Sequence, residues 1–95
     1  MRISREEHDT LIEIIKGIEP SCDVYLFGSR ADDNMQGGDI DLIILGDRKL
    51  TFDEISKIRW DFITMHGDQK IDILTFRRTD QHIMKEVALT TAISL

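Results

Sequence analysis

Two aspartates stand at the start of an apolar run and are candidates for binding a metal ion. Asp39 and Asp41 are separated by one residue and precede the apolar run at 42–45. Residues i and i+2 of a strand point to the same face, so these carboxylates should project together, with Cα atoms about 7 Å apart. Mg²⁺ prefers a few carboxylates combined with phosphate oxygens. A solvated strand start is the alternative for an Asp-x-Asp pattern taken alone.

A glycine–serine pair ends the preceding apolar stretch. Gly28 permits a tight turn and a close approach of the backbone to a ligand. Ser29 offers a hydroxyl and an N–H group, which would suit a phosphate if a helical turn starts there. Taken alone, the pair also fits an ordinary turn at the end of a strand.

A third acid interrupts a later apolar segment. Asp72 lies between Ile71 and Ile73, and a carboxylate on a central strand is costly unless it is paired or bound to a metal. The alternatives are an edge strand on which Asp72 faces solvent, or an ion pair with Lys70.

The elements that must position these residues follow from capping and periodicity. Ser4 and Thr51 each begin a capping box, which predicts two helix starts. Apolar residues then recur at helical spacing, and Pro20 and Gly67 are expected to end the two helices. The expected inner face of the second helix is Ile55, Ile58, Phe62 and Met65.

Three short segments read as strands, at 23–27, 39–45 and 70–76. A last helix is expected after Thr79 or Asp80. Its predicted inner face is Ile83, Met84, Val87 and Ala88. The order is α-β-β-α-β-α, and the link between the first two strands is too poor in helix for a parallel crossover. The predicted fold is an α/β (α+β) domain over 1–95, with a small mixed sheet of three or more strands flanked by helices.

Composition narrows the functional class. The 95 residues carry a net charge of −6, which argues against bulk binding to DNA or an anionic membrane. Cys22 is the only cysteine, so no internal disulfide or cysteine metal cluster can form. The N-terminus lacks an apolar signal core, and the apolar runs are too short to cross a bilayer. These features predict a cytoplasmic protein.

Several rival interpretations fail on position or length. A calcium loop counted from Asp32 would have Ile43 where a glutamate is needed. In phosphatases of the haloacid dehalogenase type, the Asp-x-Asp pair follows the apolar strand, whereas here it precedes one. A glycosyltransferase of the DxD type needs a larger domain. The three histidines lack the spacing of a metal site. Trp60 fits core packing or a partner contact. Arg77-Arg78 fits either a solvated pair or a nucleotide contact.

The combined pattern resembles the minimal nucleotidyltransferases (MNT) of the DNA polymerase beta-like nucleotidyltransferase superfamily. That signature is a Gly-Ser pair, a spacer of about ten residues, Asp-x-Asp, and a carboxylate on a later strand. Gly28-Ser29, nine intervening residues, Asp39-Ile40-Asp41 and Asp72 match it over essentially the whole chain.

The resemblance implies a role for each of these residues. Asp39, Asp41 and Asp72 would be catalytic and would bind two Mg²⁺ ions, and Gly28 and Ser29 would grip the triphosphate of ATP or another nucleoside triphosphate. Arg30 would be a further phosphate contact, although it fits equally well as a surface residue paired with Asp32 or Asp33.

Two hypotheses follow. The first is an Mg²⁺-dependent transfer of a nucleoside monophosphate, AMP from ATP, to an acceptor that this short chain cannot itself provide. The resemblance implies a small helical HEPN-type toxin as partner, with this chain as antitoxin; an RNA acceptor and a homodimer remain open. The second is a non-catalytic nucleotide-binding or partner-binding module that acts by contact.

Overall fold

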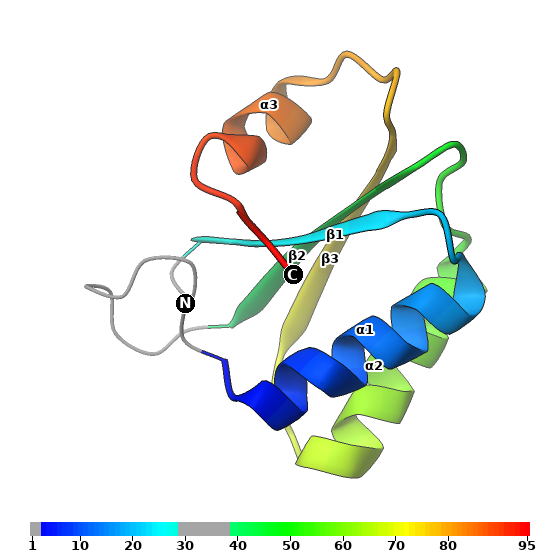
Figure 1. Ribbon diagram of the computed structural model, residues 1–95, viewed down its shortest axis with the longest axis vertical. Helices are drawn as coiled ribbons and strands as arrows, with labels where there is room; N and C mark the ends of the chain where they lie inside the picture. Colours follow the sequence, from blue (N-terminus) through cyan, green and yellow to red (C-terminus); the bar gives the residue numbers. More distant parts are fainter. Residues whose placement is uncertain (1–2, 29–38) are drawn as a thin grey trace.

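The computed structural model describes residues 3–28 and 39–95, and these form three helices and four strands (Figure 1). In chain order the elements are α1 (Arg5–Ile18), β1 (Asp23–Phe27), β2 (Ile40–Gly46), α2 (Phe52–His66), β3 (Ile71–Arg77), α3 (Ile83–Leu89) and β4 (Ile93–Ser94). The predicted order of helices and strands is confirmed, with β4 as an addition at the end.

The four strands form one mixed sheet in the order β3-β2-β1-β4. β1 is antiparallel to both β2 and β4, whereas β2 and β3 are parallel and are joined through α2. This confirms the expected mixed sheet and the absence of a parallel crossover between β1 and β2. Since α2 carries the chain between parallel strands, β2 and β3 start at the same end of the sheet.

Both predicted capping boxes are present at the helix starts. The Ser4 hydroxyl accepts from the Glu7 backbone N–H at 3.0 Å, and the Glu7 carboxylate accepts from the Ser4 N–H at 2.8 Å. Thr51 and Glu54 repeat the arrangement at the start of α2. Gly67 ends α2 with a φ of 85°, a left-handed conformation that favours glycine.

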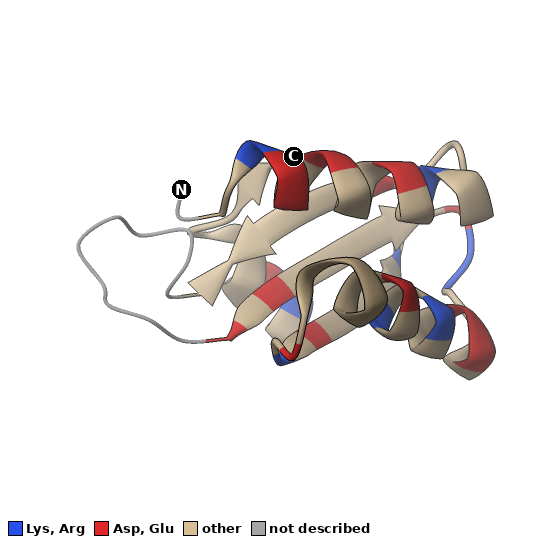
Figure 2. Ribbon diagram, turned by 90° about the horizontal axis from the view of Figure 1, so that it is seen from below, with Lys and Arg blue, Asp and Glu red and all other residues tan. Residues whose placement is uncertain are grey.

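Helices cover the two faces of the sheet unequally. α1 and α2 lie side by side on one face, and α3 lies on the other (Figures 1 and 2). β2 is buried on both sides beyond its first residues: Leu42 and Ile44 pack beneath α1 and α2, and Ile43 and Leu45 pack on the side of α3. The larger part of the core therefore lies under α1 and α2.

The predicted inner face of α3 is wrong except at Ala88, which is 4% exposed. Ile83, Met84 and Val87 are 69%, 46% and 55% exposed. The helix has only seven residues, and its C-terminal end rests on the sheet through Ala88 and Leu89. Its first turn therefore projects beyond the packed surface.

Two further expectations about helix residues need correction, and one of the two alternatives for Trp60 is excluded. His82 caps α3 in place of Thr79 or Asp80, and its ring accepts from the Met84 backbone N–H at 3.1 Å. In α2, Ile58 and Phe62 are buried as predicted, but Met65 is 65% exposed. Trp60 is 71% exposed, so it does not pack in the core.

Candidate functional site

The aspartates at the start of β2 lie on the sheet face that α3 covers only in part. Asp41 alternates with the buried Ile40 and Leu42, so its side chain points away from α1 and α2. Asp39 precedes the strand by one residue and shares this direction. Asp41 is half-buried, whereas the Asp39 side chain is 42% exposed.

Asp72 lies directly beside Asp41. The parallel register of β2 and β3 pairs the two residues, and neighbouring strands are about 4.8 Å apart. β3 is an edge strand, as one alternative for Asp72 required, yet Asp72 is half-buried and faces a second carboxylate. The strand pairing thus brings together acids that are 31 positions apart in the sequence.

Gly28 follows β1, and its backbone lies close to the Asp41 carboxylate. Phe27, its neighbour, pairs with Asp41 in the antiparallel register. Gly28 has a φ of 74°, and a Cβ added to it would lie 2.5 Å from Oδ2 of Asp41. No other residue fits without a shift of Asp41, so the backbone meets the carboxylate at a point that demands glycine.

Two of the predicted phosphate-binding residues, Ser29 and Arg30, lie outside the described residues. Their proposed roles therefore stay predictions.

Electrostatics at this cluster favour a bound cation. Burial raises the pKa of Asp41 above its ordinary range, and the negative charges of Asp72 and then Asp39 raise that pKa further. Lys70 opposes this shift, and its Nζ lies 3.5 Å from Oδ2 of Asp39. A divalent cation between Asp41 and Asp72 would relieve their repulsion, so the pair fits the metal that the family resemblance implies.

The third carboxylate does not complete that arrangement. In the part of the chain that the structure describes, no three His, Cys, Asp or Glu side chains are placed to hold a metal ion together. Asp39 is engaged by Lys70, which the sequence had suggested only as a partner of Asp72. Sequence reasoning missed this contact because the strand register sets it.

Arg77 and Arg78 lie at the far end of β3 from Asp72. Arg77 pairs with Asp80 at 3.0 Å, and Arg78 pairs with Asp47 at 2.9 Å and with Asp23 at 3.2 Å. They form a solvated structural cluster there, and the nucleotide contact considered for them does not fit this placement.

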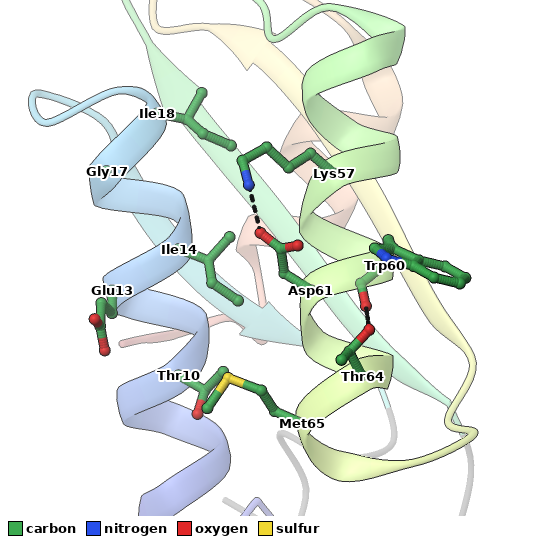
Figure 3. Close-up of a pocket in the computed structure, with 10 residues that line it drawn as sticks. All are labelled: Thr10, Glu13, Ile14, Gly17, Ile18, Lys57, Trp60, Asp61, Thr64 and Met65. Carbon is green, nitrogen blue, oxygen red and sulfur yellow. Dashed lines mark hydrogen bonds and ion pairs between the residues drawn. The ribbon is translucent and has the colours of Figure 1, made fainter.

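A second surface feature lies on the opposite face of the molecule, between α1 and α2. It is a hollow of about 520 Å³ (Figure 3). Ile14 and Gly17 line it from α1, and Trp60 and Met65 line it from α2. The ion pair between Lys57 and Asp61 closes one side at 2.6 Å. Its lining combines apolar and polar residues, and its two carboxylates, Glu13 and Asp61, come from different helices, with Asp61 paired to Lys57.

No helix among residues 3–28 and 39–95 has the length and apolar character needed to span a membrane.

Comparison with known proteins gives one family and several structures. The family described as "Polymerase beta, Nucleotidyltransferase" matches residues 9–93. A search of curated protein sequences found no match.

One similar structure contains the MntA–HpeT toxin–antitoxin pair; the matched chain has a TM-score of 0.73 and 20% identity, over 93% of this chain and 70% of that one. A second contains a tri-AMPylated HEPN toxin of Shewanella oneidensis with an MNT antitoxin, with a TM-score of 0.70 and 17% identity, over 97% of this chain and 71% of that one. A third is a candidate nucleotidyltransferase from Sulfolobus solfataricus, with a TM-score of 0.52 and 18% identity, over 99% of this chain and 89% of that one.

Identities this low establish a shared fold and nothing finer, whereas the family match covers nearly the whole chain. This chain belongs to the polymerase beta nucleotidyltransferase family, and its fold is that of the minimal nucleotidyltransferases.

Proposed function

We propose that this protein transfers AMP from ATP to an acceptor on a small helical partner of the HEPN type, and that it acts as an antitoxin by doing so. The observation that carries the proposal is the pairing of Asp41 with Asp72 across parallel strands, with the backbone of Gly28 closed against Asp41. The similar structures that hold an MNT antitoxin with a HEPN toxin, one of them tri-AMPylated, support the choice of partner and of transferred group.

In this proposal, Asp39, Asp41 and Asp72 bind Mg²⁺ ions, and Gly28, Ser29 and Arg30 hold the triphosphate. The metal would neutralise charge on the triphosphate and on the attacking oxygen. A hydroxyl of the acceptor attacks the α-phosphate in line, the bond to the β-phosphate oxygen breaks, and pyrophosphate leaves. Asp72 accepts the proton of the hydroxyl, because it lies on the edge strand where an acceptor can approach.

The test is transfer of label from ATP carrying ³²P at the α-phosphate, with Mg²⁺, to the protein that co-purifies with this chain. We expect label on the partner, and its loss in Asp41→Asn. Label on RNA would keep the reaction and change the acceptor. If neither wild type nor Asp41→Asn labels any protein or RNA, the proposed enzymatic activity is refuted.

A second candidate is a partner-binding module that acts by contact alone. The hollow between α1 and α2 favours it, because Met65 is exposed there, Trp60 is exposed on the adjoining outer side of α2 (Figure 3), and a helix of a HEPN-type partner could cover both. Asp41→Asn separates the candidates. If the variant still neutralises the toxin, contact suffices; if it binds the toxin without neutralising it, chemistry is required.

A further inference from the structure

Lys70 occupies the fourth corner of the carboxylate cluster. Asp41 pairs with Asp72 in the parallel register, and one step earlier the backbone N–H of Ile40 donates to the carbonyl of Lys70 at 3.0 Å. Asp39 and Lys70 therefore stand opposite each other, as Asp41 and Asp72 do. Side chains two residues apart on a strand share a face, so three carboxylates and one ammonium face the same way.

Contacts within this group are unequal. The Lys70 Nζ lies 3.5 Å from Oδ2 of Asp39. Burial, the charge of Asp72 and a hydrogen bond with Asp72 raise the pKa of Asp41, whereas the charge of Lys70 lowers that pKa. The Lys70 side chain is 70% exposed and the Asp39 side chain is 42% exposed. Exposed ion pairs are weak, so this one can open without disturbing the sheet.

We propose that Lys70 is a positioning residue that keeps the Asp39 carboxylate paired until a metal–nucleotide complex binds at Asp41 and Asp72. A divalent cation that uses all three carboxylates must displace the ammonium from Asp39. The freed ammonium then stands beside the bound triphosphate, where its charge is favourable. The inference rests on the proposed function, since it concerns the same three carboxylates.

The expected consequence is that metal and nucleotide bind together. A free cation that binds Asp39 must displace Lys70 and leaves its ammonium unpaired. A cation that arrives with the triphosphate also brings phosphate oxygens, with which the ammonium can pair. Lys70 therefore weakens the binding of free metal and strengthens the binding of the metal–nucleotide complex. A lysine with a purely structural role would not change these two affinities in opposite directions.

The test compares Lys70→Gln with Lys57→Gln. Lys57 is a matched control, because its side chain is 63% exposed and pairs with Asp61 on the other face of the molecule. Free Mn²⁺ is titrated into each protein without nucleotide and followed by electron paramagnetic resonance. We expect Lys70→Gln to bind Mn²⁺ about fivefold more tightly than wild type, as the loss of one nearby charge implies, and Lys57→Gln to match wild type.

The second measurement is binding of the unreactive α,β-methylene analogue of ATP with Mg²⁺, followed by calorimetry. Here Lys70→Gln should bind about fivefold more weakly than wild type, and Lys70→Arg, which keeps the charge, should bind within about twofold of it. Thermal melting in the absence of metal confirms that each variant is folded. Equal Mn²⁺ affinities for wild type and Lys70→Gln, or a shift of both affinities in the same direction, would overturn the inference.

Asp41→Asn distinguishes this failure from failure of the proposed function. If Asp41→Asn weakens Mn²⁺ binding but Lys70→Gln does not alter it, the metal site stands and only the role of Lys70 is refuted. If Mn²⁺ binding does not depend on Asp41, the proposed metal site is refuted, and the inference falls with it.

Discussion

The two faces of the sheet differ in how far the helices cover them and in the side chains that they carry. Under α1 and α2, residues such as Leu11, Ile15 and Phe62 are fully buried and form the main core. On the other face, α3 covers only one end, and the uncovered end carries Asp41 and Asp72 side by side. Apolar burial on the first face supplies the stability that tolerates two repelling carboxylates on the second.

We expect partner contact on one face of the sheet and catalysis on the other. Acidic residues occur along both helices of the first face (Figure 2), the hollow lies between those helices, and Trp60 is exposed on the side of α2 that points away from α1 (Figure 3). A partner held there would leave the carboxylates of the other face uncovered. Substitutions on the helical face should therefore weaken partner binding and, through it, transfer to that partner, whereas substitutions of the carboxylates should lower transfer while partner binding is retained.

The largest effect is expected from Asp72→Asn on the carboxylate face. Loss of the proposed proton acceptor and metal ligand should lower the rate of AMP transfer by about 10²–10³-fold, while partner binding is retained. The rate of label transfer from ATP is the measurement. Asp53→Asn is the control, because Asp53 is exposed in the first turn of α2 and lines neither the hollow nor the carboxylate cluster. Equal rates for the two variants would show that Asp72 has no part in the reaction.

On the helical face, Trp60→Ala should weaken partner binding by about 2 kcal/mol, roughly 30-fold, if Trp60 anchors the contact. Folding should be unaffected because the side chain is 71% exposed. Binding is measured by calorimetry with the co-purifying partner. Phe52→Ala is the matched control, since Phe52 is 78% exposed on the same helix but does not line the hollow. Similar losses in both variants would argue against a defined contact at the hollow.

Two glycines, one associated with each face, should respond oppositely to alanine. Gly28→Ala places a methyl group against Asp41 at a φ of 74°, and should cost about 1–2 kcal/mol of the free energy of unfolding. Gly17→Ala lies in α1 with no atom within 4 Å of the added Cβ, and should gain about 0.5–1 kcal/mol.

Urea unfolding of the two alanine variants beside wild type measures both changes. A stabilising effect of Gly28→Ala would mean that the close approach of its backbone to Asp41 is relaxed in solution.

Parts of the fold that depend on a few neighbouring residues were predicted correctly from the sequence. The capping boxes at Ser4 and Thr51 were found from four-residue patterns, and the structure confirms their hydrogen bonds. The strand at 23–27 matches β1 residue for residue. Asp39 and Asp41 were expected together from their i, i+2 spacing, and Asp72 was joined to them through the resemblance to the family signature.

Features that depend on tertiary packing could not be predicted in the same way. The spacing of Ile83, Met84 and Val87 is the same for a helix face that packs on a core and for one that remains exposed. Lys70 was considered only beside Asp72, its neighbour on the same strand, because its pairing with Asp39 depends on the register between β2 and β3.

The smallest effect concerns how stability depends on pH on the carboxylate face. Burial, followed by the charges of Asp72 and Asp39, raises the pKa of Asp41 in the folded protein. The folded state therefore holds this proton more tightly than the unfolded chain, in which an aspartate has a pKa of about 3.9. As pH rises from that value through the raised pKa, the unfolded state loses its proton first, and stability falls.

Asp41→Asn removes the titrating carboxylate, so this contribution to the pH dependence of stability is lost. The melting temperature of the variant relative to wild type should therefore rise over that pH window and then level off, by less than about 4 °C because solvent screens a half-buried carboxylate. Thermal melts at low salt from acidic to neutral pH are the measurement. Asp68→Asn, at an exposed turn position before β3, is the control. Mg²⁺ should reduce the difference between wild type and Asp41→Asn, because a cation at Asp41 and Asp72 stabilises only the protein that keeps both carboxylates.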